Sequence, residues 1–105
     1  MASDFSGQEK AALSFENIYQ EFGGNADFQF LMGLIYMKNA RFGEAIREFE
    51  RASQQPDSRN VGVNSYAANY NIGVIYECLG DLEDARVYYK KCGEYEPAKE
   101  RLEAI

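Results

Sequence analysis

The sequence repeats itself at a spacing of 40 residues, and this repetition limits the folds that the chain can adopt. The first copy contains Gly33, Tyr36, Ala45, Phe49 and Ala52, and the second contains Gly73, Tyr76, Ala85, Tyr89 and Cys92. A partial copy lies upstream, where Ala11, Phe15 and Ile18 precede Ala45, Phe49 and Ala52 by 34 residues. Repeats of about 20 to 50 residues are typical of arrays whose units stack and bury a continuous core. The chain is therefore predicted to be a stack of similar units.

Residues 70–92 show what each unit contains. Apolar residues recur at helical spacing on both sides of the Gly80-Asp81 pair. They are Ile72, Ile75, Tyr76 and Leu79 before the pair, and Leu82, Ala85, Tyr88, Tyr89 and Cys92 after it. Glycine favours the C-terminal end of a helix, and aspartate favours the N-cap of the next. The unit is thus predicted to be two antiparallel helices joined by a tight turn.

The same reasoning along the whole chain predicts an all-α protein of about six helices. We expect them over residues 8–22, 26–39, 42–54, 64–79, 82–95 and 97–104. Residues 1–7 are expected to be a disordered tail or an expression remnant. Asn25 is the expected N-cap of the second helix, and Pro97 is suited to the first turn of the last one. That last helix is expected to cap the array, with Leu102 and Ile105 facing inward.

The pattern resembles the tetratricopeptide repeat, in which helix hairpins stack into a right-handed superhelix. The chain departs from the family pattern at Gln29, Asn69, Pro56 and Cys92. Its period of 40 exceeds the family's 34 by six residues, which we expect to lengthen a loop and add a turn to the following helix. The resemblance implies one domain over residues 8–105. Its parts are a half repeat (8–25), a repeat (26–57), an inserted loop (58–63), a second repeat (64–96) and a capping helix (97–105).

A narrower resemblance concerns residues 62–81, Tyr-Tyr-Lys-Lys-Cys-Gly at 88–93 and Glu-Pro-Ala-Lys-Glu-Arg-Leu at 96–102. These runs look like the repeat region at the C-terminal end of some bacterial family 2 glycosyltransferases. The resemblance implies an accessory region that positions an acceptor or dimerises, without the catalytic part. The incomplete first repeat agrees with an expectation that the chain is a segment of a longer protein.

Composition argues against several kinds of function. The net charge of −6 disfavours binding to nucleic acid, which needs a basic face. The sequence contains no histidine, which excludes histidine-based catalytic triads and histidine metal ligands. It contains no phosphate-binding glycine loop, and helix capping explains the acidic residues Asp81, Glu83 and Asp84. We therefore expect no enzyme activity in this segment, and no cofactor or metal.

Location in the cell is inferred from the cysteines and from hydropathy. Cys78 and Cys92 fall at opposite ends of one predicted hairpin, so we expect reduced thiols and a cytoplasmic protein. No apolar run approaches the roughly 20 residues that cross a bilayer, and no secretory signal is visible.

In the resembled family, the first helices of successive hairpins line a concave groove that holds a protein or peptide. The residues that we expect to bind a partner in this groove are Asp27, Phe30, Leu34, Met37, Lys38, Tyr70, Asn71, Val74 and Glu77. Helical phase places Leu31, Ala67 and Cys78 on the same face. The apolar members either belong to the core or anchor a partner segment. In the second case Asn71 would bind the partner backbone, and Lys38 and Glu77 would set the charge of the rim. Only Asn71 sits where some family members grip a chaperone's terminal carboxylate, so that ligand is not expected.

Two further functions stay open. The apolar face of residues 8–22, with Phe15, Tyr19 and Phe22, suits a homodimer contact or an upstream domain of the same chain. The glycosyltransferase resemblance suits an acceptor-positioning role. Neither alternative needs the groove.

Overall fold

The computed structural model describes residues 25–105, and every element of regular structure in this range is a helix. The helices are α2 (Ala26–Lys38), α3 (Phe42–Ser53), α4 (Tyr66–Cys78), α5 (Leu82–Lys91) and α6 (Glu96–Ala104). These five correspond to five of the six expected helices and confirm the all-α prediction. The expected helix over residues 8–22 lies outside the described residues, as does its apolar face.

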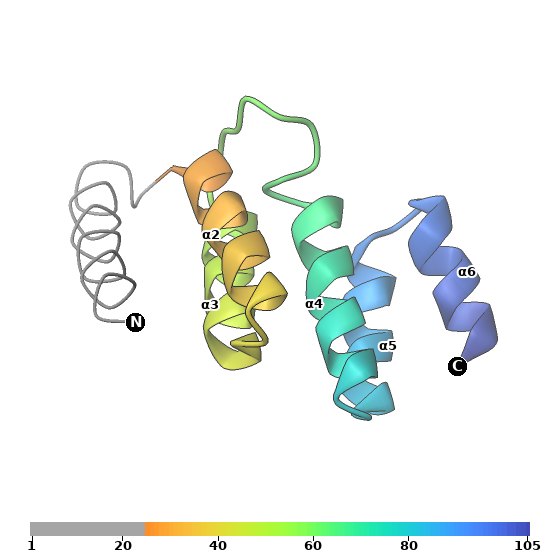
Figure 1. Ribbon diagram of the computed structural model, residues 1–105. Helices are drawn as coiled ribbons and strands as arrows, with labels where there is room; N and C mark the ends of the chain where they lie inside the picture. Colours follow the sequence, from red (N-terminus) through yellow and green to blue (C-terminus); the bar gives the residue numbers. More distant parts are fainter. Residues whose placement is uncertain (1–24) are drawn as a thin grey trace, which may run out of the picture.

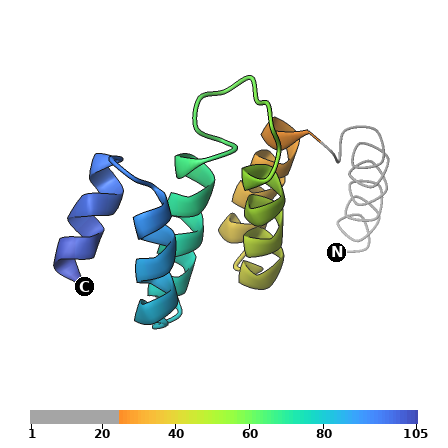
Figure 2. The same ribbon diagram turned by 180° about the vertical axis from the view of Figure 1, so that it is seen from behind.

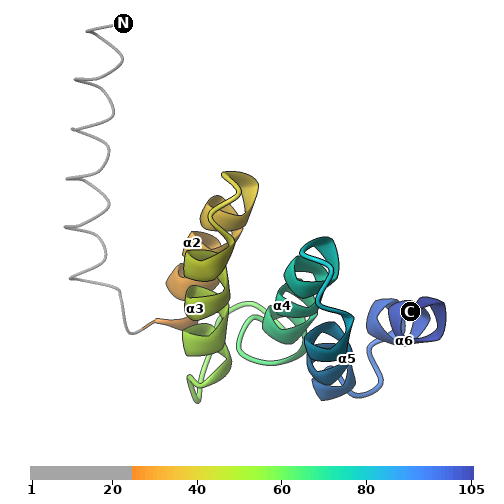
Figure 3. The same ribbon diagram turned by 90° about the horizontal axis from the view of Figure 1, so that it is seen from below.

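The helices form two hairpins and a final single helix. Helix α2 packs along α3, and α4 packs along α5. Helices α2 and α4 lie on the front in Figure 1, whereas α3 and α5 are in front in Figure 2, which is seen from behind. The hairpins stand side by side, and α6 packs against α5 beyond them (Figure 3). This is the stacked arrangement that the sequence repeat predicts.

Local chemistry sets the ends of the helices. The side chain of Asn25 accepts a hydrogen bond from the backbone N–H of Phe28 at 3.1 Å, and Asp81 accepts one from Asp84 at 3.3 Å. Both caps are as predicted. Helix α5 was expected to extend to residue 95, but it ends at Lys91. The chain turns at Gly93, whose φ of 64° ends the helix, and α6 then begins at Glu96 with proline in its first turn.

The repeated glycine and aromatic residues are partners within each hairpin. A Cβ atom on Gly33 would lie 2.6 Å from the ring of Phe49, and one on Gly73 would lie 2.7 Å from the ring of Tyr89. Each glycine therefore lets the first helix of its hairpin approach a buried ring on the second helix. Glycine and aromatic residue each recur after 40 residues because the same contact between two helices occurs in both hairpins.

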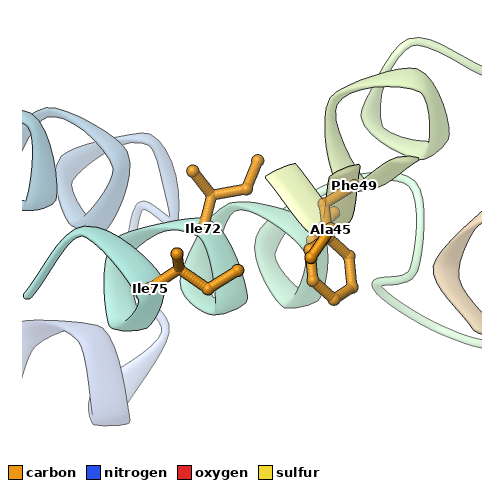
Figure 4. Close-up of a cluster of buried hydrophobic side chains, with 5 residues drawn as sticks. Ala45, Phe49, Ile72 and Ile75 are labelled. Atoms are coloured by element: carbon orange, nitrogen blue, oxygen red, sulfur yellow. The ribbon is translucent and has the colours of Figure 1, made fainter. Parts of the chain in front are cut away.

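The core continues between the hairpins. Ala45 and Phe49 from α3 and Ile72 and Ile75 from α4 are buried in one cluster, and Figure 4 shows these four side chains where the two helices meet. At the rim of this contact, the Tyr88 hydroxyl donates to a Glu50 carboxylate oxygen at 2.7 Å. Stacking of the hairpins thus combines apolar burial with a polar link.

The segment between α3 and α4 contains the inserted residues and arches over the two hairpins (Figure 1). We expected some of them to add a turn to α4. That expectation is wrong, because α4 has 13 residues and α2 also has 13. The whole insertion is in the loop, where backbone N–H groups bond to an α2 side chain instead of continuing a helix.

Candidate functional site

The predicted groove residues on α2 differ in how far they are buried. Phe30, Leu34 and Met37 are half-buried and pack against the core cluster that α3 and α4 share. The rings of Phe30 and Phe49 meet edge to face at a centroid distance of 5.3 Å. Lys38, at the end of the helix, is exposed. The three apolar residues therefore have one side in the core and the other side open.

Beside them lies a hollow of about 540 Å³ with a mainly apolar lining. Its lining residues are Asp27, Phe28, Phe30, Leu31, Leu34, Asn60 and Val63. Leu31 is 52% exposed although it is a large apolar residue on a packed helix. It lies on the side of α2 away from Gly33, which faces α3. An exposed leucine among half-buried apolar neighbours is the kind of surface that binding sites use.

Asp27 belongs to this hollow, but its carboxylate is already engaged. It accepts hydrogen bonds from the backbone N–H groups of Arg59 at 2.8 Å and Asn60 at 2.9 Å, and from the Asn60 side-chain amide at 2.9 Å. These hydrogen bonds hold the pKa of Asp27 below its usual value, because they favour the charged form. Asp27 therefore fastens the inserted loop to the first turn of α2.

Three of the four predicted groove residues on α4, namely Tyr70, Val74 and Glu77, contact α5 or the C-terminal segment of the chain. The ring of Tyr70 lies 5.7 Å from that of Tyr89 and 5.4 Å from that of Tyr95. Val74 joins the same cluster, which includes Leu102 and Ile105 of the C-terminal segment. The side-chain amide of Asn71 donates to the carbonyl of Ala67, one turn earlier in α4, at 3.0 Å.

Glu77 links three helices. It accepts a hydrogen bond from the Tyr89 hydroxyl of α5 at 2.8 Å, and one from Arg101 Nε of α6 at 3.0 Å. A second Arg101 nitrogen contacts the other carboxylate oxygen, which makes the pair bidentate. The hydrogen bond from Arg101 is the main reason why the pKa of Glu77 lies below its usual value. Glu77 therefore attaches α6 to the second hairpin.

The structure thus divides the nine predicted residues into two groups. From the α2 group, Asp27, Phe30 and Leu34 line the open hollow, whereas Met37 and Lys38 do not. From the α4 group, Tyr70, Val74 and Glu77 pack on or bond to α5 and the C-terminal segment, whereas Asn71 bonds within α4. Sequence reasoning did not include Asn60 and Val63, because helical phase says nothing about a loop. A carboxylate in the first turn of α2 and an asparagine in the insertion were the available signals, but nothing in the sequence pairs two residues 33 positions apart.

No other chemistry gathers in the part of the chain that the structure describes. Among residues 25–105, no group of three cysteine or acidic side chains is arranged to hold a metal ion. Cys78 is exposed and Cys92 is buried, and neither is in a disulfide. Burial raises the pKa of the Cys92 thiol to about 11, so it is a poor nucleophile. No helix in this range is long and apolar enough to cross a membrane.

The hairpins and their stacking define a helical repeat protein. The sequence model of the tetratricopeptide repeat matches residues 26–54 and 66–100, which together make up more than half of the chain. The chain therefore belongs to the tetratricopeptide repeat family. The first matched segment covers the hairpin of α2 and α3. The second covers the hairpin of α4 and α5 and continues into α6 as far as residue 100. No curated protein and no solved structure matches the chain. The family match gives no support to a glycosyltransferase as the parent protein. The cytoplasmic location stays a prediction.

Proposed function

We propose that this chain is a non-catalytic interaction module that binds a segment of a protein partner in an apolar-aromatic groove on α2. Tetratricopeptide repeats generally bind protein partners. The observation that supports this site is the hollow beside α2, in which Leu31 is 52% exposed between the half-buried Phe30 and Leu34. An anchor side chain seated there would remove this apolar surface from water.

The two groups of predicted residues make unequal contributions to this proposal. Phe30 and Leu34 keep the role of anchors, with Met37 behind them. Tyr70 and Val74 already contact α5 and the C-terminal segment, and Glu77 is paired with Arg101. A partner would have to displace α6 to reach them fully. We therefore place the partner on α2 and not across both hairpins.

A non-catalytic role is part of the proposal, and it is argued from the chemistry of the residues that are present. The sequence has no histidine, and the one carboxylate in the hollow, Asp27, is held by three donors. A base or nucleophile must be available to a substrate, and Asp27 is not. The homodimer hypothesis depends on Phe15, Tyr19 and Phe22, which lie outside the described residues, and it stays a hypothesis.

The test uses random dodecapeptides displayed on phage, selected on the purified chain. A selected peptide is then synthesised with a fluorescent label, and its binding is measured by anisotropy. Leu31→Glu should weaken binding by about tenfold or more, because it places a charge in the apolar hollow. Val87→Glu is the matched control, since Val87 is 48% exposed on α5. Failure to select any peptide, or equal losses in both variants, would refute the site.

A further inference from the structure

The helices of the two hairpins pack against each other mainly on one side of the stack. Helix α3 packs against α4 around the shared core cluster, whereas α2 and α4, the first helices of the two hairpins, have little direct contact. Helices that meet through apolar side chains can slide and tilt relative to each other. The contact between α3 and α4 therefore holds the hairpins together but leaves the angle between them adjustable.

The inserted loop provides a second connection, which starts on α2. The Asp27 carboxylate accepts hydrogen bonds from the N–H groups of Arg59 and Asn60 and from the Asn60 side-chain amide. A charged acceptor forms stronger hydrogen bonds than a neutral one. Nearer to α3, the side-chain amide of Gln55 donates to Gln29 Oε1 at 3.2 Å. The chain between α3 and α4 is thus fastened to the start of α2 at two points.

From this attachment the chain reaches α4 through hydrogen-bonded turns. The N–H of Val63 bonds to the Asn60 carbonyl at 3.5 Å. The N–H groups of Ser65 and Ala67 donate to the Gly62 carbonyl at 3.0 and 2.9 Å, and Ala67 already belongs to α4. Hydrogen bonds therefore continue from the residue that Asp27 holds into the first turn of α4.

Packing and one further bond hold the end of the loop that leads into α4. Gly62 has a φ of 85°, and a Cβ atom added there would lie 2.5 Å from the ring of Tyr66, the first residue of α4. That ring lies 4.7 Å from the ring of Tyr95, which precedes α6. The side-chain amide of Asn64 donates to the Gln55 carbonyl at 2.9 Å and so closes the base of the loop. The loop is thus fitted to α2 and to α4 at the same time.

We propose that residues 55–65 form a brace that fixes the angle between the two hairpins, with Asp27 as its attachment point on α2. The brace spans the ends of α2 and α4 where the loop arches over the hairpins (Figure 1). A repeat of regular length is about six residues shorter, so the brace is a feature of this chain. The inference needs neither a partner nor the hollow beside α2. The alternative is that the loop is ordered but does not constrain the hairpins.

Double electron–electron resonance between two spin labels tests the brace, because it measures the spread of one distance between the hairpins. Lys38→Cys and the native Cys78 place exposed labels at the ends of α2 and α4 away from the loop, whereas the buried Cys92 stays unlabelled. This chain should give one narrow distance distribution. Adding Asp27→Ala should widen the distribution about twofold or more, because the brace is released from α2. Asp57→Ala is the matched control, since it removes an exposed carboxylate of the same segment, and it should leave the width unchanged.

Amide hydrogen exchange shows whether the attachment itself is formed. The N–H groups of Arg59 and Asn60 should exchange slowly in the wild type, and about tenfold or more faster in Asp27→Ala. Asp27→Asn keeps one acceptor oxygen and should widen the distance distribution less, and it serves as the test if Asp27→Ala does not fold.

Three outcomes would overturn the brace. One is fast exchange of both amides, or a broad distance distribution, in the wild type. Another is a narrow distribution in an Asp27 variant whose amides at 59 and 60 have lost their protection. The third is equal widening by Asp57→Ala. No peptide is present in these measurements, so their failure leaves the proposed function standing, and failure to select a peptide leaves the brace standing.

Discussion

Replacing Gly33 with alanine tests the close helix contact on which each hairpin depends. In a solvent-exposed helix, glycine to alanine stabilises by about 1 kcal/mol, because alanine is the better helix former. At Gly33 the added Cβ would lie 2.6, 2.7 and 2.8 Å from three ring atoms of Phe49. Comfortable contacts between carbon atoms are about 3.5 to 4.0 Å, so helix or ring has to move by about 1 Å.

Phe49 has little room for this movement. Its side chain is fully buried, and its ring also meets Phe30. Inserting a methyl group into a packed core typically costs about 1–3 kcal/mol. Because the neighbour is a rigid ring, we expect a cost near the upper end of this range. The better helix propensity of alanine offsets about 1 kcal/mol of that cost. The variant is expected to lose about 2 kcal/mol of unfolding free energy.

Urea denaturation followed by circular dichroism at 222 nm measures this loss. Gly43→Ala is the matched control in α3, because nothing lies within 4 Å of its added Cβ, and it should be neutral or stabilising by up to about 1 kcal/mol. Phe49→Leu in the Gly33→Ala background should recover part of the stability. A Gly33→Ala variant as stable as the wild type would show that the contact is not tight, and the reasoning would fail.

Four further predictions concern turns, packing, charge and thiols. Ala40 has a φ of 60° where the second hairpin has Gly80 at 83°, so Ala40→Gly should raise the unfolding free energy by about 1 kcal/mol in urea, whereas Gly80→Ala should lower it. Tyr70→Ala should destabilise the fold by about 3 kcal/mol, because the ring of Tyr70 packs on two other tyrosines. An unchanged melting curve would contradict this packing role and would favour Tyr70 as a partner-binding residue of the groove. The pKa of Glu77 is lower in the folded protein than its unfolded value of about 4.3, so the ionised carboxylate stabilises the fold above that value. This stabilisation is lost as the pH falls through the folded pKa. The Glu77→Gln variant should therefore be less stable than the wild type at pH 7, and the difference in unfolding free energy should be smaller at pH 3. A thiol reagent at pH 8 should label Cys78 rapidly and Cys92 only on unfolding, and Cys78→Ser should remove the rapid phase; rapid labelling of two thiols would contradict the burial of Cys92.

Local sequence accounts for most of the architecture. Helix periodicity, the Asn25 and Asp81 caps and the paired glycine and aromatic positions act over a few residues or within one hairpin. The turns of the two hairpins also contain equivalent hydrogen bonds. The N–H of Arg41 donates to the Tyr36 carbonyl in the first turn, and the N–H of Asp81 donates to the Tyr76 carbonyl in the second. Such signals are readable because their partners are close in sequence. The added turn of α4 was a wrong prediction, because a count of inserted residues does not say where they go.

The candidate site depended on tertiary structure in a way that the sequence pattern does not show. Helical phase groups the predicted residues of α2 and α4 on one face of each helix, and it treats Leu34 and Tyr70 alike. Which of the two stays open depends on α6, whose Arg101 pairs with Glu77 and whose neighbour Tyr95 contacts Tyr70. The attachment of the inserted loop to α2 likewise depends on the hydrogen bonds that Asp27 accepts from residues 59 and 60. The sequence by itself determined the helices and their pairing, because those forces are local and periodic; the folded chain decided which apolar face remained exposed, because that depends on contacts between residues far apart in sequence.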